Sequence, residues 1–259
     1  RSVVSEALSR ASSVELQPSL DAVGTPASRG RWVIVDLETT GLGAGAEITE
    51  IGAVSVQDGA IIDEFSSLVK PSRPIPPFIT SLTGITPAMV ANADPIASVL
   101  ERFMDWSGLG TKGGPVLVAH NASFDVGFLR RAARASSLPW PRIRVVDTLA
   151  LARLALPRPL VRNHKLGTIA SYFGTATVPE HRALGDARAT AEILLGFIDL
   201  LAGAGATDVE DLVALTERAP ARRPSTPSFV ADLPTSPGVY HFIDTAGDTL
   251  YVGSASSLR

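Results

Sequence analysis

Four carboxylates and one histidine in this sequence have the residue types needed to bind divalent metal ions and to accept a proton. Asp36 and Glu38 lie two residues apart, Asp125 follows a short apolar run, and His181 precedes Asp186 by five residues. Carboxylate oxygens are ligands that Mg²⁺ and Mn²⁺ prefer, and a neutral imidazole can accept a proton from water. If the fold brings these five side chains together, they could carry out metal-assisted hydrolysis.

Asp36 and Glu38 stand at the end of the apolar run 32–37, whose Val and Ile content predicts a buried strand. Side chains two residues apart on a strand point to the same side of a sheet, so both carboxylates can share a ligand. Two acids in apolar surroundings repel each other, and a bound cation would relieve that repulsion. Taken alone, however, an Asp-x-Glu pattern is more often found in a solvated turn.

Asp125 falls in the first turn of the expected helix 123–135, directly after the expected strand 115–119. Stabilisation of the helix dipole is a sufficient explanation for an acid at that position when it is considered alone. His120 ends the same strand, and we expect it to be a hydrogen-bonded structural histidine.

Asp186 opens the long helix expected over 184–201, and His181 would lie on the loop side of that helix. From there the imidazole could take a proton from a water molecule beside the carboxylates. A single loop histidine is more often simply exposed to solvent.

The elements that must position these residues alternate between strands and helices. The pair Asp58 and Gly59 is a strong hairpin signal, so the first three strands should form an antiparallel meander. We therefore predict an α/β fold in which a mixed sheet, an antiparallel meander plus parallel strands, is flanked by helices. The expected strands are 32–37, 50–57, 61–69, 115–119 and 143–146, and the expected helices are 95–106, 123–135, 148–156, 166–173 and 184–201.

Three segments in a fixed order carry a family resemblance. V-D-L-E-T-T-G, H-N-A-S-F-D-V-G-F-L and H-R-A-L-G-D-A-R-A-T resemble the three motifs of the DEDDh exonucleases, which include polymerase proofreading subunits. The resemblance covers about 31–203, and the ordered triple is far more specific than any single segment. It implies a ribonuclease H-like sheet and 3′-to-5′ exonuclease activity with two divalent ions, Mg²⁺ or Mn²⁺. It assigns metal ligation to Asp36, Glu38, Asp125 and Asp186, and proton abstraction to His181.

The resemblance also implies how a nucleic acid with a free 3′ end would be bound, with DNA favoured over RNA and a nucleoside 5′-monophosphate as product. The backbone after the first acids would approach the terminal nucleotide, and the segment 82–85 would help to wedge the terminal base. An aromatic ring near Asp125 could stack on a base. The residues expected to contact substrate are Leu37, Thr39, Leu82, Gly84, Ile85 and Phe124.

The chain is expected to contain four segments. A weakly ordered arm over 1–30, with one short helix near 3–10, precedes the exonuclease domain 31–203, and 204–236 holds a short helix and a proline-rich linker. In 237–259, P-G-V-Y-H-F-I-D and L-Y-V-G resemble the beginning of a UvrC-like GIY-YIG nuclease domain. The sequence ends near the start of the helix that carries this family's catalytic arginine, so we expect no endonuclease activity from this partial unit. A plain hairpin with packed aromatic residues is the alternative.

Composition narrows the possible functions. The 259 residues include no cysteine, which excludes disulfides, thiolate zinc sites and cysteine nucleophiles. Neither a secretory signal nor a run of about 18 apolar residues is present, which predicts a cytoplasmic protein without a membrane partner. The net charge of -3 argues against a broad basic surface and predicts a weak grip on DNA.

Two alternative functions remain open at this stage. A 3′-to-5′ exoribonuclease that trims RNA would use the same five residues, because they do not read the 2′ hydroxyl. A catalytically silent nucleic-acid-binding module would be expected to have lost a carboxylate, whereas all five residues are present. The UvrC-like tail favours DNA repair or proofreading by association.

Overall fold

The computed structural model describes residues 24–43, 45–157, 159–218, 234, 236–243 and 249–255. It divides into two compact units, 1–219 and 220–259, which are described separately. The short helix expected near 3–10 lies outside the described residues, as does most of the expected linker.

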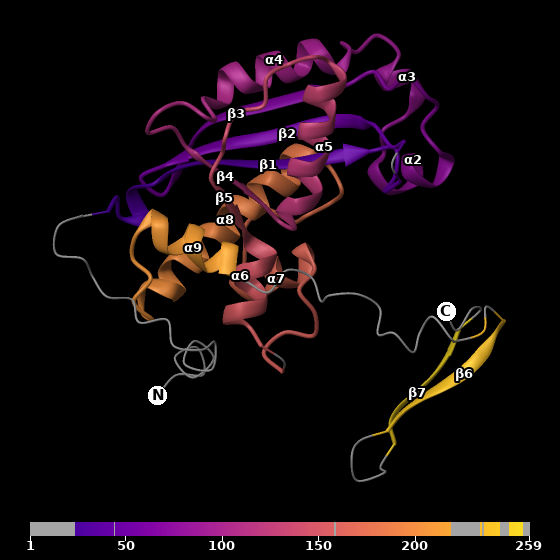
Figure 1. The fold of residues 1–259 in the computed structure, drawn as a ribbon, viewed down its shortest axis with the longest axis vertical. Helices are drawn as coiled ribbons and strands as arrows, with labels where there is room; N and C mark the ends of the chain where they lie inside the picture. Colours follow the sequence, from indigo (N-terminus) through magenta and orange to yellow (C-terminus); the bar gives the residue numbers. More distant parts are fainter. Residues whose placement is uncertain are drawn as a thin grey trace. The chain divides into compact units, whose positions relative to one another are not determined.

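A mixed sheet of five strands forms the centre of the first unit, with the order β3-β2-β1-β4-β5 (Figure 1). The first three strands are antiparallel neighbours, whereas β4 runs parallel to β1 and β5 parallel to β4. The predicted meander followed by parallel strands is confirmed. The strands are β1 (Arg31–Thr39), β2 (Ile48–Gln57), β3 (Ala60–Leu68), β4 (Val116–Ala119) and β5 (Val145–Asp147).

Asp58 and Gly59 make the tight turn between β2 and β3. Both residues have positive φ, 50° and 77°, as the two central residues of a type I′ hairpin turn require. This turn conformation matches the right-handed twist of the strands that it joins.

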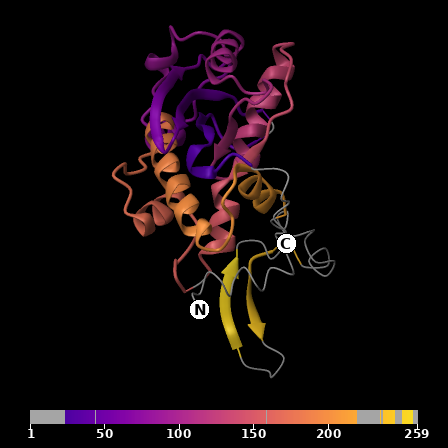
Figure 2. The same cartoon turned by 90° about the vertical axis from the view of Figure 1, so that its left-hand side faces the viewer.

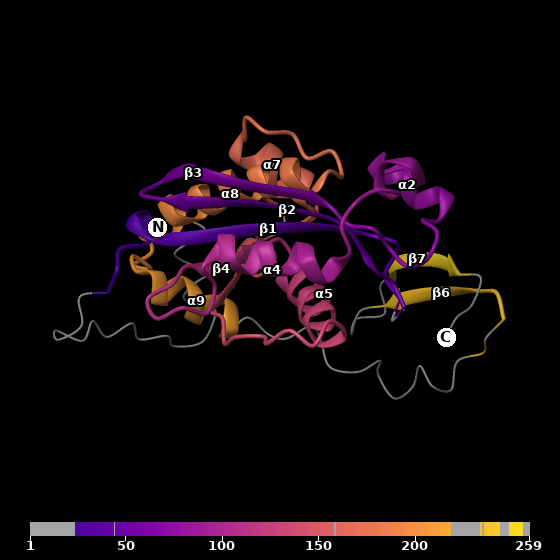
Figure 3. The same ribbon diagram turned by 90° about the horizontal axis from the view of Figure 1, so that it is seen from above.

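Helices cover both faces of the sheet (Figures 2 and 3). One face packs against α4 and α5, and the other against α6, α7 and α8. Leu212 and Val213 of α9, which the sequence analysis places after the exonuclease domain, are buried in the same cluster as α6 and α8. The helices are η1 (Ala27–Arg29), α2 (Pro77–Thr83), α3 (Pro87–Val90), α4 (Ile96–Ser107), α5 (Ala122–Ala135), α6 (Thr148–Ala155), α7 (Leu166–Phe173), α8 (Ala183–Ala202) and α9 (Val209–Arg218). None of the helices in the described part of the chain combines the length and the apolar character needed to cross a bilayer.

The alternation of side chains along β1 determines where its acids point. Trp32 and Ile34 are buried in the cluster beneath α8, and Val33 and Val35 in the cluster beneath α4 and α5. Asp36 and Glu38 follow Trp32 and Ile34 at intervals of two residues, so their side chains point to the same face of the sheet. Both carboxylates therefore lie on the α8 side of the sheet.

Gly52 on β2 allows the first turn of α8 to lie directly on the sheet. A Cβ atom at this position would be 2.1 Å from the backbone nitrogen of Leu184 and 2.2 Å from the carbonyl carbon of Ala183. No side chain fits in that space. The close contact brings the beginning of α8 next to the ends of β1 and β2, where the acids stand.

Gly52→Ala should therefore destabilise the first unit by about 1–3 kcal/mol, because the added methyl group must displace the backbone of α8. Gly167→Ala is the matched control, since a Cβ atom at this exposed position in α7 meets nothing within 4 Å. That substitution should be neutral or stabilising by up to about 1 kcal/mol. Urea unfolding measures the free energy of unfolding of both variants. Equal values for the two would contradict the close contact at Gly52.

The second unit is a two-stranded antiparallel sheet of β6 (Gly238–Ile243) and β7 (Thr249–Ala255). The backbones of Tyr240 and Gly253 are partners in its register. A hairpin is the alternative that the sequence analysis leaves open here, and residues 244–248 between the two strands lie outside the described residues.

Candidate active site

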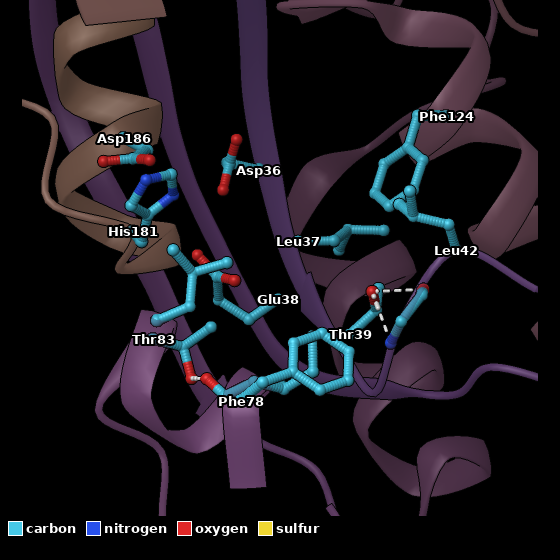
Figure 4. A pocket seen from close by; sticks show the side chains of 13 residues that line it. Asp36, Leu37, Glu38, Thr39, Leu42, Phe78, Thr83, Phe124, His181 and Asp186 are labelled. Carbon is cyan, nitrogen blue, oxygen red and sulfur yellow. Dashed lines mark hydrogen bonds between the residues drawn. The ribbon is translucent and has the colours of Figure 1, made fainter. Parts of the chain in front are cut away.

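A cavity of about 550 Å³ opens at the end of β1, beside the start of α8 (Figure 4). Asp36, Glu38, His181 and Asp186 lie along one side of it. Single ligand atoms from Glu38, His181 and Asp186 all lie within 4.8 Å of one another. Residues from distant parts of the sequence thus converge at one position, as predicted for these four.

Asp125 reaches the same cluster from α5, on the other side of β1. Its side chain is only 3% exposed and does not line the cavity itself. It is close enough to Asp36 to raise the pKa of that carboxyl, and the nearby backbone amide of Leu37 opposes the rise in the pKa of Asp125 itself.

Asp147 holds the loop that leads into α5. One of its carboxylate oxygens accepts hydrogen bonds from the backbone amides of Asn121 and Leu149, both at 2.9 Å. Asn121 has a positive φ of 75°, an uncommon conformation that such a contact helps to stabilise. Asp147 therefore caps α6 and also fixes the turn from which Asp125 is presented.

His181 is exposed and sits in a backbone conformation with a φ of 57°. A non-glycine residue in this region is strained, and such strain often occurs at functional sites. Asp186 stabilises the loop because one of its carboxylate oxygens accepts a hydrogen bond from the amide of Glu180 at 2.9 Å. The acid thus helps to hold the histidine at the mouth of the cavity.

Burial and mutual repulsion raise the pKa values of the acids. Burial is the largest cause for Asp36, and the charges of Asp125, Asp186 and Glu38 raise its pKa further. The pKa of Glu38 rises to about 8 through burial, then through the charges of Asp186 and Glu50. Burial also raises the pKa of Asp125 and Asp186, although hydrogen bonds from backbone amides oppose the rise in both.

This donor set fits a divalent cation. Buried carboxylates that must share a small volume are costly when ionised, and a cation among them offsets both the repulsion and the burial. Carboxylate oxygens with one imidazole are suitable ligands for hard divalent metals.

His120 has a structural environment, as the sequence predicts. Its Nδ1 lies 3.0 Å from the hydroxyl of Thr148, and its Nε2 lies 2.9 Å from the carbonyl oxygen of His164. Both ring nitrogens are therefore occupied, and burial lowers the pKa of the imidazole. The contacts connect the end of β4 to α6 and to the loop before α7.

An apolar rim faces the acids across the cavity (Figure 4). Leu42, Phe78 and Leu82 are 86%, 66% and 51% exposed, an unusual degree for large apolar side chains that gather at one opening. Leu37, Thr39 and Phe124, all expected from the sequence to contact substrate, also line the cavity. Reasoning from the sequence missed Phe78 and Leu42, and only their position beside a proline cluster or a glycine turn could have drawn attention to them.

Gly84 and Ile85, which were also expected near the substrate, do not line this cavity. Gly84 ends α2 with a positive φ of 71°, and this turn directs the chain inward. Ile85 is consequently fully buried and packs with Ile75, Ile79 and Val90. Its side chain supports α2 from beneath rather than facing the opening.

A mixed sheet with a buried acidic cluster at the end of its central strand defines a nuclease of the ribonuclease H-like type. Residues 33–194, more than half of the chain, match the sequence profile of the exonuclease family. The chain belongs to this family, in its DEDDh type, and is accordingly an enzyme that hydrolyses phosphodiester bonds.

Relatives with this sequence pattern include much longer proteins. A Mycobacterium tuberculosis protein whose name proposes a bifunctional exonuclease/endonuclease is 43% identical over 235 residues, which cover 88% of this chain and 36% of that protein. The PolC-type DNA polymerase III of Caldanaerobacter subterraneus is 41% identical over 184 residues, covering 71% of this chain and 13% of the polymerase. The chain thus spans only about a third or less of these relatives.

Solved structures of single nuclease domains agree with the fold. Exonuclease X in complex with 5′ overhanging duplex DNA is 31% identical, with a TM-score of 0.54 over 71% of this chain and 99% of that one. The nuclease domain of 3′hExo, a DEDDh family member bound to rAMP, is 25% identical, with a TM-score of 0.58 over 66% of this chain and 92% of that one.

The raised pKa values predict that stability falls as pH rises when divalent cations are absent. The pKa of Glu38 is about 8 in the folded chain against an ordinary 4.5. Between these values the folded state binds more protons than the unfolded state, so the free energy of unfolding decreases as pH increases. In a chelator, the melting temperature should fall by about 5 °C or more from about pH 5 to about pH 8.

Glu38→Gln is the control for this melting series, because glutamine does not titrate and should make the fall with pH shallower. Added divalent cation should raise the melting temperature more at about pH 8 than at about pH 5, since protons compete for the same oxygens. A melting temperature in chelator that is independent of pH, with the same slope in the variant, would contradict the electrostatic account of the cluster.

Proposed function

We propose that this chain is a metal-dependent 3′-to-5′ exonuclease that hydrolyses terminal phosphodiesters of DNA and releases nucleoside 5′-monophosphates. The observation that carries the proposal is the cavity, which has an acidic cluster and an exposed imidazole on one side and an apolar rim on the other. Carboxylates on one side could hold metal ions that bind a phosphate, and apolar side chains on the other side could contact the face of a base.

The proposed ligands of two divalent ions, Mg²⁺ or Mn²⁺, are Asp36, Glu38, Asp125 and Asp186. Such ions, when bound, lower the pKa of water and offset the negative charge that develops on the phosphate. The four carboxylates would hold these ions, and with them their positive charge, at the end of β1. Asp125, buried on α5, lies close enough to Asp36 to share in holding the ions.

His181 is the proposed general base. It is exposed at the mouth of the cavity, and its ring lies within 4.8 Å of oxygens from Glu38 and Asp186. The imidazole accepts a proton from the attacking water, whose oxygen bonds to phosphorus while the bond between phosphorus and the 3′ oxygen of the preceding nucleotide breaks. Asp186 keeps the loop of this histidine in place through the Glu180 amide.

The terminal nucleotide is proposed to lie along Leu37 and Thr39, with its base against the apolar rim of the cavity. Phe78 offers a ring for stacking, and Leu42 and Leu82 border the same opening. These exposed side chains replace Gly84 and Ile85 as our candidates for contact with the base. Phe124 contributes its ring from the α5 side.

DNA is our favoured substrate, and repair or proofreading our favoured role. The polymerase relatives and the exonuclease X complex with DNA support this choice. An RNA substrate is the second candidate, because 3′hExo, a solved neighbour, holds rAMP. A catalytically silent binding module finds no support in a cluster in which all four carboxylates are present.

The proposed organisation keeps an exonuclease domain over 31–203, a segment over 204–236 and a partial GIY-YIG unit over 237–259. The antiparallel pairing of β6 and β7 is compatible with the hairpin that begins such a unit. The name of the Mycobacterium tuberculosis relative, which proposes both an exonuclease and an endonuclease, supports this assignment. The exonuclease proposal does not depend on it.

A time course on 5′-labelled single-stranded DNA and matched RNA tests the proposed function. With Mg²⁺ or Mn²⁺ the label should form a ladder that shortens from the 3′ end, faster on DNA, and a chelator should stop the reaction. Asp36→Asn should slow cleavage by at least about a hundredfold, because the charge that holds the ions is lost. Asp199→Asn, an exposed acid near the other end of α8, should cleave like the unmodified chain.

Each alternative gives a different pattern in this assay. Faster shortening of RNA would assign the chain to the exoribonucleases. Internal cuts or shortening from the 5′ end would refute the proposed direction, and intact label with both metals would leave only the binding module. Full activity of Asp36→Asn would remove the acidic cluster from the reaction.

A further inference from the structure

Glu50 is a buried carboxylate beside the proposed active site, and the proposed mechanism gives it no role. It lies on β2 directly opposite Glu38 in the register of the two strands, and its side chain is only 3% exposed. Neighbouring acids in this arrangement repel each other, so a second buried acid next to the cluster is costly unless a nearby group offsets its charge.

Arg182 and the start of α8 offset that charge. The Glu50 Oε1 atom accepts a hydrogen bond from Nη2 of Arg182 at 2.8 Å, and Oε2 accepts from Nε at 3.2 Å and from the backbone amide of Ala183 at 3.1 Å. Arg182 is the N-cap residue of α8, and its own side chain makes no capping hydrogen bond. A residue of the neighbouring strand therefore caps this helix.

The contacts of Glu50 fall within the short stretch that carries two of the proposed catalytic groups. His181 directly precedes Arg182, and Asp186 lies one turn into α8. The stretch is held on one side by the bond from the Glu180 amide to Asp186, and on the other by the three bonds to Glu50. The strained φ of His181 lies between these two attachments.

We propose that Glu50 and Arg182 are positioning residues for the reaction. Their ion pair and the cap on Ala183 fix the start of α8 on β2, and thereby place His181 and Asp186 against Asp36 and Glu38. This inference rests on the proposed catalytic roles of His181 and Asp186. Neither Glu50 nor Arg182 lines the cavity, so the pair acts through the residues beside it.

A second ion pair on α8 provides a matched control. Arg188 donates from Nε to Glu64 on β3 at 2.7 Å, with a further bond from Nη2, so the two pairs have the same chemistry. The Arg188 pair is more exposed, and neither of its residues lines the cavity. Removing the Arg188 pair therefore measures how much a strand-to-helix ion pair contributes to activity when the residues next to His181 are unchanged.

The kinetic test compares Arg182→Ala, Glu50→Gln and their double variant with Arg188→Ala. The first two should lower kcat by about 10-fold to 100-fold with KM changed less than about threefold, because misplaced catalytic groups slow the chemical step more than binding. The double variant should lose no more than the worse single variant, since the two residues act as a unit. Arg182→Lys, which keeps the charge but not the paired bonds, should recover part of the rate.

The structural test needs neither metal nor activity. The sequence has four histidines, so the imidazole NMR signal of His181 can be assigned by its loss in His181→Asn. This signal should shift in Arg182→Ala and Glu50→Gln and stay unchanged in Arg188→Ala. If the buried Glu50→Gln change prevents folding, the half-exposed Arg182 still carries the comparison through its Ala and Lys variants.

Unchanged kcat and an unchanged His181 signal in Arg182→Ala would overturn the proposal. An equal loss of kcat in Arg188→Ala would also overturn it, because the effect would then be one of general stability. If the unmodified chain cleaves no nucleic acid, the proposed function fails instead, and the His181 signal still decides whether the pair sets the position of this histidine.

Discussion

Burial of like charges at the end of β1 is the constraint on which the arrangement of this chain depends. Asp36 and Glu38 point to the same side of the sheet because side chains alternate along a strand, and Asp125 and Asp186 reach them from helices on its two faces. Each acid raises the cost of ionising the others. A divalent cation offsets this cost, so the stability of the fold and the chemistry of the site depend on the same interaction.

Backbone amides and neighbouring charges prepare the cluster for that cation. Asp186 accepts from the Glu180 amide, and Asp147 holds the turn before α5, the helix that carries Asp125. Gly52 lets the backbone at the start of α8 lie directly on β2, beside the acids. The acids are thereby fixed by parts of the chain that take no part in the reaction, as a preorganised electrostatic site requires.

Local patterns were sufficient to predict the sheet, whereas the convergence of the acids was implied by the resemblance of three ordered motifs to those of the DEDDh exonucleases. The period of two on β1, the Asp58 and Gly59 turn, and acids in the first turns of two helices each depend on residues near in sequence. The contact of Glu50 with Arg182 joins residues 132 positions apart, and no local pattern indicates it. For the same reason the sequence could not separate exposed Phe78 from buried Ile85, because tertiary packing decides which apolar side chain faces the cavity.

The most direct test of this account is a crystal structure with Mn²⁺, located by its anomalous scattering. We predict two peaks about 3.5 to 4 Å apart among Asp36, Glu38, Asp125 and Asp186, both absent in Asp36→Asn. No peak at the cluster, or peaks only at other sites on the chain, would contradict the claim that these carboxylates are arranged to hold divalent cations.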